Sequence, residues 1–158
     1  MKRSCLIFPL ILVLFAFTGC KKSVVFEEKV IFPNSNWAFE NKAITFKAPL
    51  TGAKNPFKII IELELNGTPN VDMMYAVFTI ITPKGGKTMK STVFNFLSPR
   101  EDYIVKKSPN EKIYRLTLYP KKYFSETGEY TFEINQLSHK ADNYGIHALT
   151  LRIERVKE

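Results

Sequence analysis

The sequence predicts an all-β protein, an antiparallel β-sandwich of immunoglobulin-like or jelly-roll-like type with about eight strands. Three observations predict this fold class. Apolar and polar residues alternate through several short segments, as they do in half-buried strands. Turns that contain Gly or Pro separate these segments. No segment has the length and 3.6-residue period of an amphipathic helix, and a partly open barrel is the second choice for such a chain.

The expected strands differ in how clearly they alternate. In chain order they are residues 24–32, 43–47, 57–66, 74–82, 88–97, 113–119, 128–135 and 149–154. Residues 57–66 place large apolar side chains on one face and Lys58, Glu62 and Glu64 on the other. Residues 74–82 are apolar on both faces, which predicts a central strand covered on both sides.

The C-terminal part of the chain shows the clearest strand pattern. In 128–135 the residues Tyr130, Phe132 and Ile134 alternate with polar residues, and Leu149, Leu151 and Ile153 repeat this pattern near the end of the chain. The Gly-x-Tyr at Gly128 is similar to the corner tyrosine of immunoglobulin-like sandwiches.

The N-terminus has the features of a cleaved export signal. Met1-Lys2-Arg3 is followed by 13 apolar residues from Cys5 to Phe17, fewer than the about 18 that a transmembrane helix requires. Thr18-Gly19-Cys20 resembles the bacterial lipobox. We therefore expect residues 1–19 to be a lipoprotein signal peptide and residues 20–158 to form one β-sandwich domain. Cys20 is the expected attachment site of diacylglycerol and an acyl chain; the alternative is ordinary secretion with Cys20 as a free thiol or disulfide partner.

Composition and charge exclude several classes of protein. With 45% hydrophobic residues, seven Gly and two Cys among 158 residues, the chain is neither disordered nor collagen-like, nor a disulfide-stapled miniprotein. The formal net charge is +8, a balance typical of proteins that meet nucleic acid, membrane surfaces or acidic partners. Because an exported protein meets no cellular nucleic acid, we expect headgroups, lipopolysaccharide or acidic proteins instead. Lysines in turns and on edge strands also protect sheets from edge-to-edge pairing.

The sequence offers no catalytic or metal-binding constellation. His139 and His147 are the only histidines, and their spacing fits no local zinc motif. Glu62 and Glu64 share a strand face, but we interpret them as residues of a solvated face rather than a glycosidase pair. We expect no enzyme activity, no cofactor beyond the lipid, no metal and no small-molecule substrate. Trp37, the single tryptophan, is either a glycan-stacking platform, an interface anchor or a core residue at a strand start.

The order of several motifs resembles a known family. After the lipobox cysteine come Ile31-Phe32-Pro33-Asn34-Ser35-Asn36-Trp37, the Gly-x-Tyr-x-Phe-x-Ile-x-Gln of residues 128–136, then Gly145-Ile146 and Leu151-Arg152-Ile153-Glu154. This arrangement is similar to the GldH family of gliding-motility lipoproteins of the Bacteroidetes over essentially the whole mature chain. The resemblance implies a non-enzymatic component that works with other lipoproteins of the gliding-motility and type IX secretion machinery.

A partner interface and a location in the cell envelope are also expected. The candidate interface residues are Trp37, Gln136, His139 and Arg152. Gln136 is expected to end its strand by bonding a neighbouring loop, and Arg152 to pair with Glu129 or Glu133 if the last two strands are neighbours. No acidic residue follows Cys20 before Glu27, which favours an outer-membrane anchor that faces the periplasm. The alternative function is a lectin-like sandwich that binds glycan or peptidoglycan through exposed aromatic residues such as Trp37.

Overall fold

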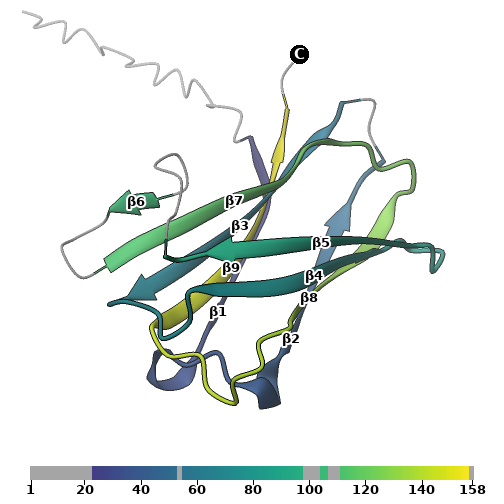
Figure 1. Ribbon diagram of the computed structural model, residues 1–158. Helices are drawn as coiled ribbons and strands as arrows, with labels where there is room; N and C mark the ends of the chain where they lie inside the picture. Colours follow the sequence, from purple (N-terminus) through teal and green to yellow (C-terminus); the bar gives the residue numbers. More distant parts are fainter. Residues whose placement is uncertain (1–22, 53–54, 98–103, 107–110, 157–158) are drawn as a thin grey trace, which may run out of the picture.

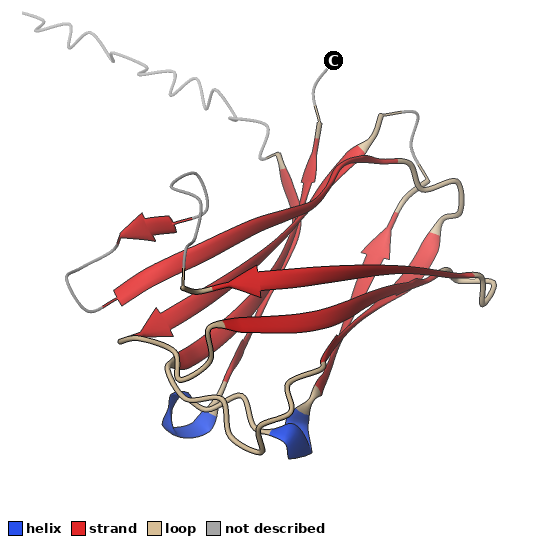
Figure 2. Cartoon of the chain, viewed as in Figure 1, coloured by secondary structure: helices blue, strands red, loops and turns tan. Residues whose placement is uncertain are grey.

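The computed structural model describes residues 23–52, 55–97, 104–106 and 111–156, and it is an all-β sandwich of two antiparallel sheets (Figures 1 and 2). The strands are β1 (Val24–Ile31), β2 (Ala43–Leu50), β3 (Phe57–Asn66), β4 (Met73–Ile81), β5 (Lys87–Asn95), β6 (Ile104–Lys106), β7 (Glu111–Lys122), β8 (Gly128–Gln136) and β9 (Ile146–Arg155). Two short 3₁₀ turns, η1 (Pro33–Ser35) and η2 (Phe39–Asn41), lie between β1 and β2. One sheet has the order β1-β9-β3-β7-β6 and the other β2-β8-β4-β5.

The predicted fold class is confirmed, and each of the eight expected segments contains a strand. The strand over 57–66 has the predicted bounds, whereas β7 is longer than expected and reaches Lys122. The three-residue β6 was not predicted, because so short a segment has no measurable alternation. The signal peptide and Cys20 lie outside the described residues. In the part of the chain that the structure describes, no helix is long and apolar enough to cross a membrane.

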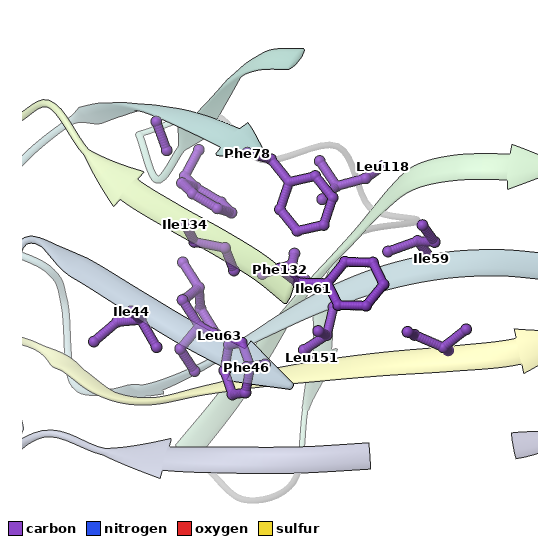
Figure 3. Close-up of a cluster of buried hydrophobic side chains, with 14 of the residues drawn as sticks. Ile44, Phe46, Ile59, Ile61, Leu63, Phe78, Leu118, Phe132, Ile134 and Leu151 are labelled. Carbon is purple, nitrogen blue, oxygen red and sulfur yellow. The ribbon is translucent and has the colours of Figure 1, made fainter. Parts of the chain in front are cut away.

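Alternating side chains from both sheets meet between them and form the core. Figure 3 shows Phe78, Phe132 and Ile134 from one sheet packed toward Ile61 and Leu63 from the other. Phe132 has no exposed surface, and the centre of its ring lies 6.0 Å from that of Phe78. The alternation that predicted the strands is therefore the pattern that fills the core.

The prediction that 74–82 is covered on both faces is wrong. β4 does lie between β8 and β5 in its sheet, and Phe78 on its inner face is fully buried. On its outer face, however, Tyr75 keeps 57% of its surface exposed. The strand with both faces buried is β3, where Ile60 and Glu62 on the outer face are also buried. Residue type alone does not distinguish β3 from β4, because the side chains that cover an outer face come from the neighbouring strands.

Tyr130 forms the corner contact that the Gly-x-Tyr pattern predicts. Its hydroxyl donates to the carbonyl oxygen of Glu126 at 2.9 Å and accepts from the backbone N–H of Glu126 at 3.2 Å. Burial raises the pKa of the Tyr130 hydroxyl. The phenol is consequently held as a neutral donor that fastens the loop before β8.

We expect Tyr130→Phe to lower the free energy of unfolding by about 1–2 kcal/mol, because two backbone groups of Glu126 lose their partner. The raised pKa means that the folded state keeps the proton longer than the unfolded state does, so the hydroxyl's contribution is complete below about pH 10 and is lost as pH rises through the folded pKa. Urea unfolding at neutral and alkaline pH measures both effects. Tyr123→Phe, at an exposed tyrosine, is the control and should change stability by less than about 0.5 kcal/mol.

Candidate functional site

Trp37 is a core residue. It has no exposed surface, its ring stacks on Phe32 with the ring centres 5.1 Å apart, and its indole Nε1 donates to the carbonyl oxygen of Asn41 at 2.9 Å. Asn143 is also fully buried and donates from Nδ2 to the carbonyl oxygen of Trp37 at 2.9 Å. The expectations that Trp37 is a glycan platform or an interface anchor are wrong, because its ring is fully buried and packs within the sandwich.

Gln136 is buried as well and supports the segment that follows it. Its Oε1 accepts the backbone N–H of Ser138 at 2.7 Å, and its own N–H donates to the carbonyl oxygen of Lys42 at 2.9 Å. It does end its strand by bonding a loop, as predicted. Because it has no exposed surface, the prediction that Gln136 itself contacts a partner is wrong. Its effect is to fix the turn that carries Leu137 and His139.

Arg152 does not pair with Glu129 or Glu133, so that prediction is wrong. β8 and β9 belong to opposite sheets, and the strands beside β9 are β1 and β3. Arg152 Nε instead lies 2.9 Å from Glu154 Oε1 and 3.5 Å from Glu27 Oε2, on the outer face of the five-stranded sheet. These are ion-pair distances on a partly exposed face, where such pairs contribute under about 1 kcal/mol. The structure brings Arg152 near none of the other candidate residues.

The two strand carboxylates are separately neutralised. Arg115 Nε donates to Glu62 Oε1 at 2.7 Å, and Lys29 pairs with Glu64. Glu62 is buried, so the interpretation of both glutamates as residues of a solvated face is wrong for Glu62. Each carboxylate is therefore engaged by a basic side chain of another strand, and the pair is not free for a shared substrate.

His147 and His139 line two different cavities, of which the one beside His139 is described below. His147 lines a cavity of about 220 Å³ with Glu64 and Lys112, and its Nδ1 lies 3.2 Å from Ser35 Oγ. This contact ties η1 to β9. Among the described residues, no group of three or more His, Cys, Asp or Glu side chains is placed to hold a metal ion.

The surface that sequence reasoning missed is an apolar area on the outer side of the four-stranded sheet. We call it the apolar sheet face, and it consists of five exposed side chains: Met73, Tyr75, Met89, Val93 and Leu137. The β4–β5 hairpin aligns Tyr75 directly opposite Val93, and the N–H of Leu137 donates to the carbonyl oxygen of Tyr75 at 2.8 Å. Residues from three segments are thereby held side by side on one face.

A groove continues the apolar sheet face beyond the end of β4. Its volume is about 390 Å³, and its lining includes Met73, Tyr75, Leu137 and His139. Lys140 Nζ bonds the carbonyl oxygen of Asn70 across it. Of the four candidate interface residues, His139 is the one that borders this surface, and Gln136 supports it from below.

A recognisable signal for this surface was present in the sequence. β4 contains no charged residue, and four of its five outward residues are apolar: Met73, Tyr75, Val77 and Ile81. That pattern predicted a cover, but the described part of the chain supplies none for Met73 and Tyr75. Exposed apolar side chains that gather on one face of a sheet can bind another protein surface by apolar contact. Comparisons of the chain with protein-family models, curated proteins and solved structures give no match.

Proposed function

We propose that this protein is a non-enzymatic lipoprotein of the cell envelope that docks a partner protein on the apolar sheet face. In this proposal lipid on Cys20 anchors it to the outer membrane, with the domain facing the periplasm. Its role is that of a scaffold or stabilising component of the gliding-motility and type IX secretion machinery, as the resemblance to the GldH family implies.

The observation that carries the docking role is the clustering of exposed apolar side chains on one rigid sheet. Tyr75 is 57% exposed and Met89 72% exposed, and both project from a hairpin whose nine residue pairs are in continuous register. Exposed apolar side chains that gather on one face of a protein mark interaction sites. Tyrosine supplies much contact area with few rotatable bonds, and methionine adapts its shape to a partner.

The lectin-like alternative rested on an exposed Trp37, and Trp37 is buried. Glycan platforms need an exposed aromatic ring, and the ring of Trp37 is enclosed between Phe32 and the backbone of the adjoining loop. We therefore do not propose glycan binding through Trp37.

Charged substitutions on the apolar sheet face test the docking role. In a strain that glides and lacks its own copy, we expect Tyr75→Lys with Met89→Lys to abolish surface spreading or type IX cargo export, because two ammonium groups would have to be desolvated at the contact. The deletion strain should show the same defect. Thermal unfolding of the purified variant should match the wild type, since both side chains are already solvated.

Ile31→Lys is the matched control. Ile31 is 62% exposed on β1 of the opposite sheet, so its substitution adds one lysine, against two in the test variant, at a similar exposure away from the proposed contact. It should restore spreading and export fully. A deletion strain that glides and exports normally would refute the machinery assignment. Full restoration by the Tyr75 and Met89 variant would refute docking on this face.

A further inference from the structure

The four sheet edges are not equally protected against pairing with another strand. β1 carries a register shift between Val24 and Phe26, β2 contains Pro49, and β6 is three residues long. Bulges, prolines and short strands block edge-to-edge association, as do lysines, which β5 has at Lys87 and Lys90. β5 contains neither Pro nor Gly, and all nine of its residues pair with β4 without a register shift. It is a long, regular edge (Figure 1).

Lys90, the charged residue on the inner face of β5, is already engaged within its own chain. Its Nζ donates to the carbonyl oxygen of Leu118 and lies 4.7 Å from the ring centre of Tyr119. Lys90 therefore bridges the two sheets, because Leu118 and Tyr119 lie on β7 of the other sheet. An inward charge can deter an incoming strand, because the added strand would bury it without a partner. The ammonium of Lys90 already has partners in its own chain, so an added strand need not supply them.

The sequence of β5 is complementary to itself in one antiparallel register. With Ser91 opposite Ser91 of a second copy, Met89 lies opposite Val93, and Lys87 lies opposite Asn95. Lys90 then faces Thr92, so no two like charges stand opposite each other. Because Tyr75 is already opposite Val93, an apolar row would run from Tyr75 through Val93 to Met89 of the second copy.

We infer that two copies of this protein pair edge to edge through β5, antiparallel and centred on Ser91. The product is a continuous sheet with four strands from each copy and a two-fold axis beside Ser91. It joins the two apolar sheet faces into one surface. This pairing stands independently of the proposed docking role, because it uses the backbone edge of β5 rather than the outward side chains alone.

Cysteine crosslinking in intact envelopes tests both the pairing and its register. Directly opposed residues in antiparallel strands have Cβ atoms about 4.5–5.5 Å apart, close enough for a disulfide or a short bis-maleimide to join them. We expect Ser91→Cys to convert most of the full-length protein to a species of twice the mass under mild oxidation. The unsubstituted protein, treated in parallel, reports any contribution from Cys5 and Cys20.

Two further variants fix the register. In the proposed pair, residue 89 of one copy is about 13 Å along the strand from residue 89 of the other, so Met89→Cys alone should not crosslink. Met89→Cys combined with Val93→Cys should crosslink as well as Ser91→Cys does. Thr45→Cys on the Pro-containing edge strand β2 should not crosslink. The substituted positions are exposed, so these variants should fold like the unsubstituted protein.

The pairing would be overturned by any of three results. Ser91→Cys could remain a monomer with both the oxidant and the bis-maleimide. It could crosslink no better than Met89→Cys alone, which would indicate random collision. It could also form a discrete adduct with a different protein, which would show that a partner's strand occupies this edge.

Discussion

Gly145→Ala is expected to destabilise the protein by about 3–4 kcal/mol, because the residue combines a left-handed backbone with close contact to a second segment. Gly145 has a φ of +88°, and a Cβ there would lie 2.8 Å from the Cα of Pro69 and 2.9 Å from the carbonyl oxygen of Thr68. Both contacts are with backbone, which cannot rotate away. Urea denaturation measures the loss.

Gly67→Ala is the control for this prediction. Gly67 also has a positive φ, +81°, but nothing lies within 4 Å of the position a Cβ would take. Its substitution should cost only the backbone strain of about 1–2 kcal/mol. Equal losses in the two variants would show that the contact with Pro69 contributes nothing.

Trp37→Ala is expected to lower the free energy of unfolding by about 3–5 kcal/mol, the cost of emptying a large buried aromatic site. The stacking partner Phe32 and the carbonyl oxygen of Asn41 would both lose their contact. The midpoint of urea unfolding reports this loss directly. Any fall in activity of this variant in cells should track the fall in its folded fraction.

Trp37→Phe separates the hydrogen bond from the packing. The smaller ring can still stack on Phe32 but cannot donate to Asn41, so we expect a loss of about 1–3 kcal/mol. If Trp37→Ala unfolds at the same urea concentration as the wild type, the core assignment of Trp37 is wrong. A glycan contact would then return as an explanation for this residue.

Period-two alternation predicted most of the fold. Tyr130, Phe132 and Ile134 point inward as their spacing requires, and Tyr130 makes the corner contact that its position after Gly128 indicates. The order of strands in the sheets was not predictable in the same way. Arg152 and Glu133 lie on strands that are consecutive in the chain, yet these strands belong to different sheets. Alternation reports which face of a strand is apolar, but carries no information on which strand lies beside it.

The candidate site was predicted less well than the fold. Trp37 and Gln136 were chosen by residue type and motif, and both are buried. His139 does border the groove beside the apolar sheet face. Tyr75 and Met89 were not chosen, because an apolar residue on a strand is expected to be buried. Whether it is buried depends on which other segments of the chain pack against it.

The sequence by itself determined the all-β class, the strand segments and the inward pattern of apolar side chains, because these depend on residues a few positions apart. The tertiary structure alone decided which apolar face stayed open and which edge stayed unblocked. The outer side of β3 is closed in part by Arg115 on the adjacent strand β7, whereas the outer side of β4 receives no such cover from the described chain. That difference arises from strand order, which is set by contacts between residues far apart in the sequence.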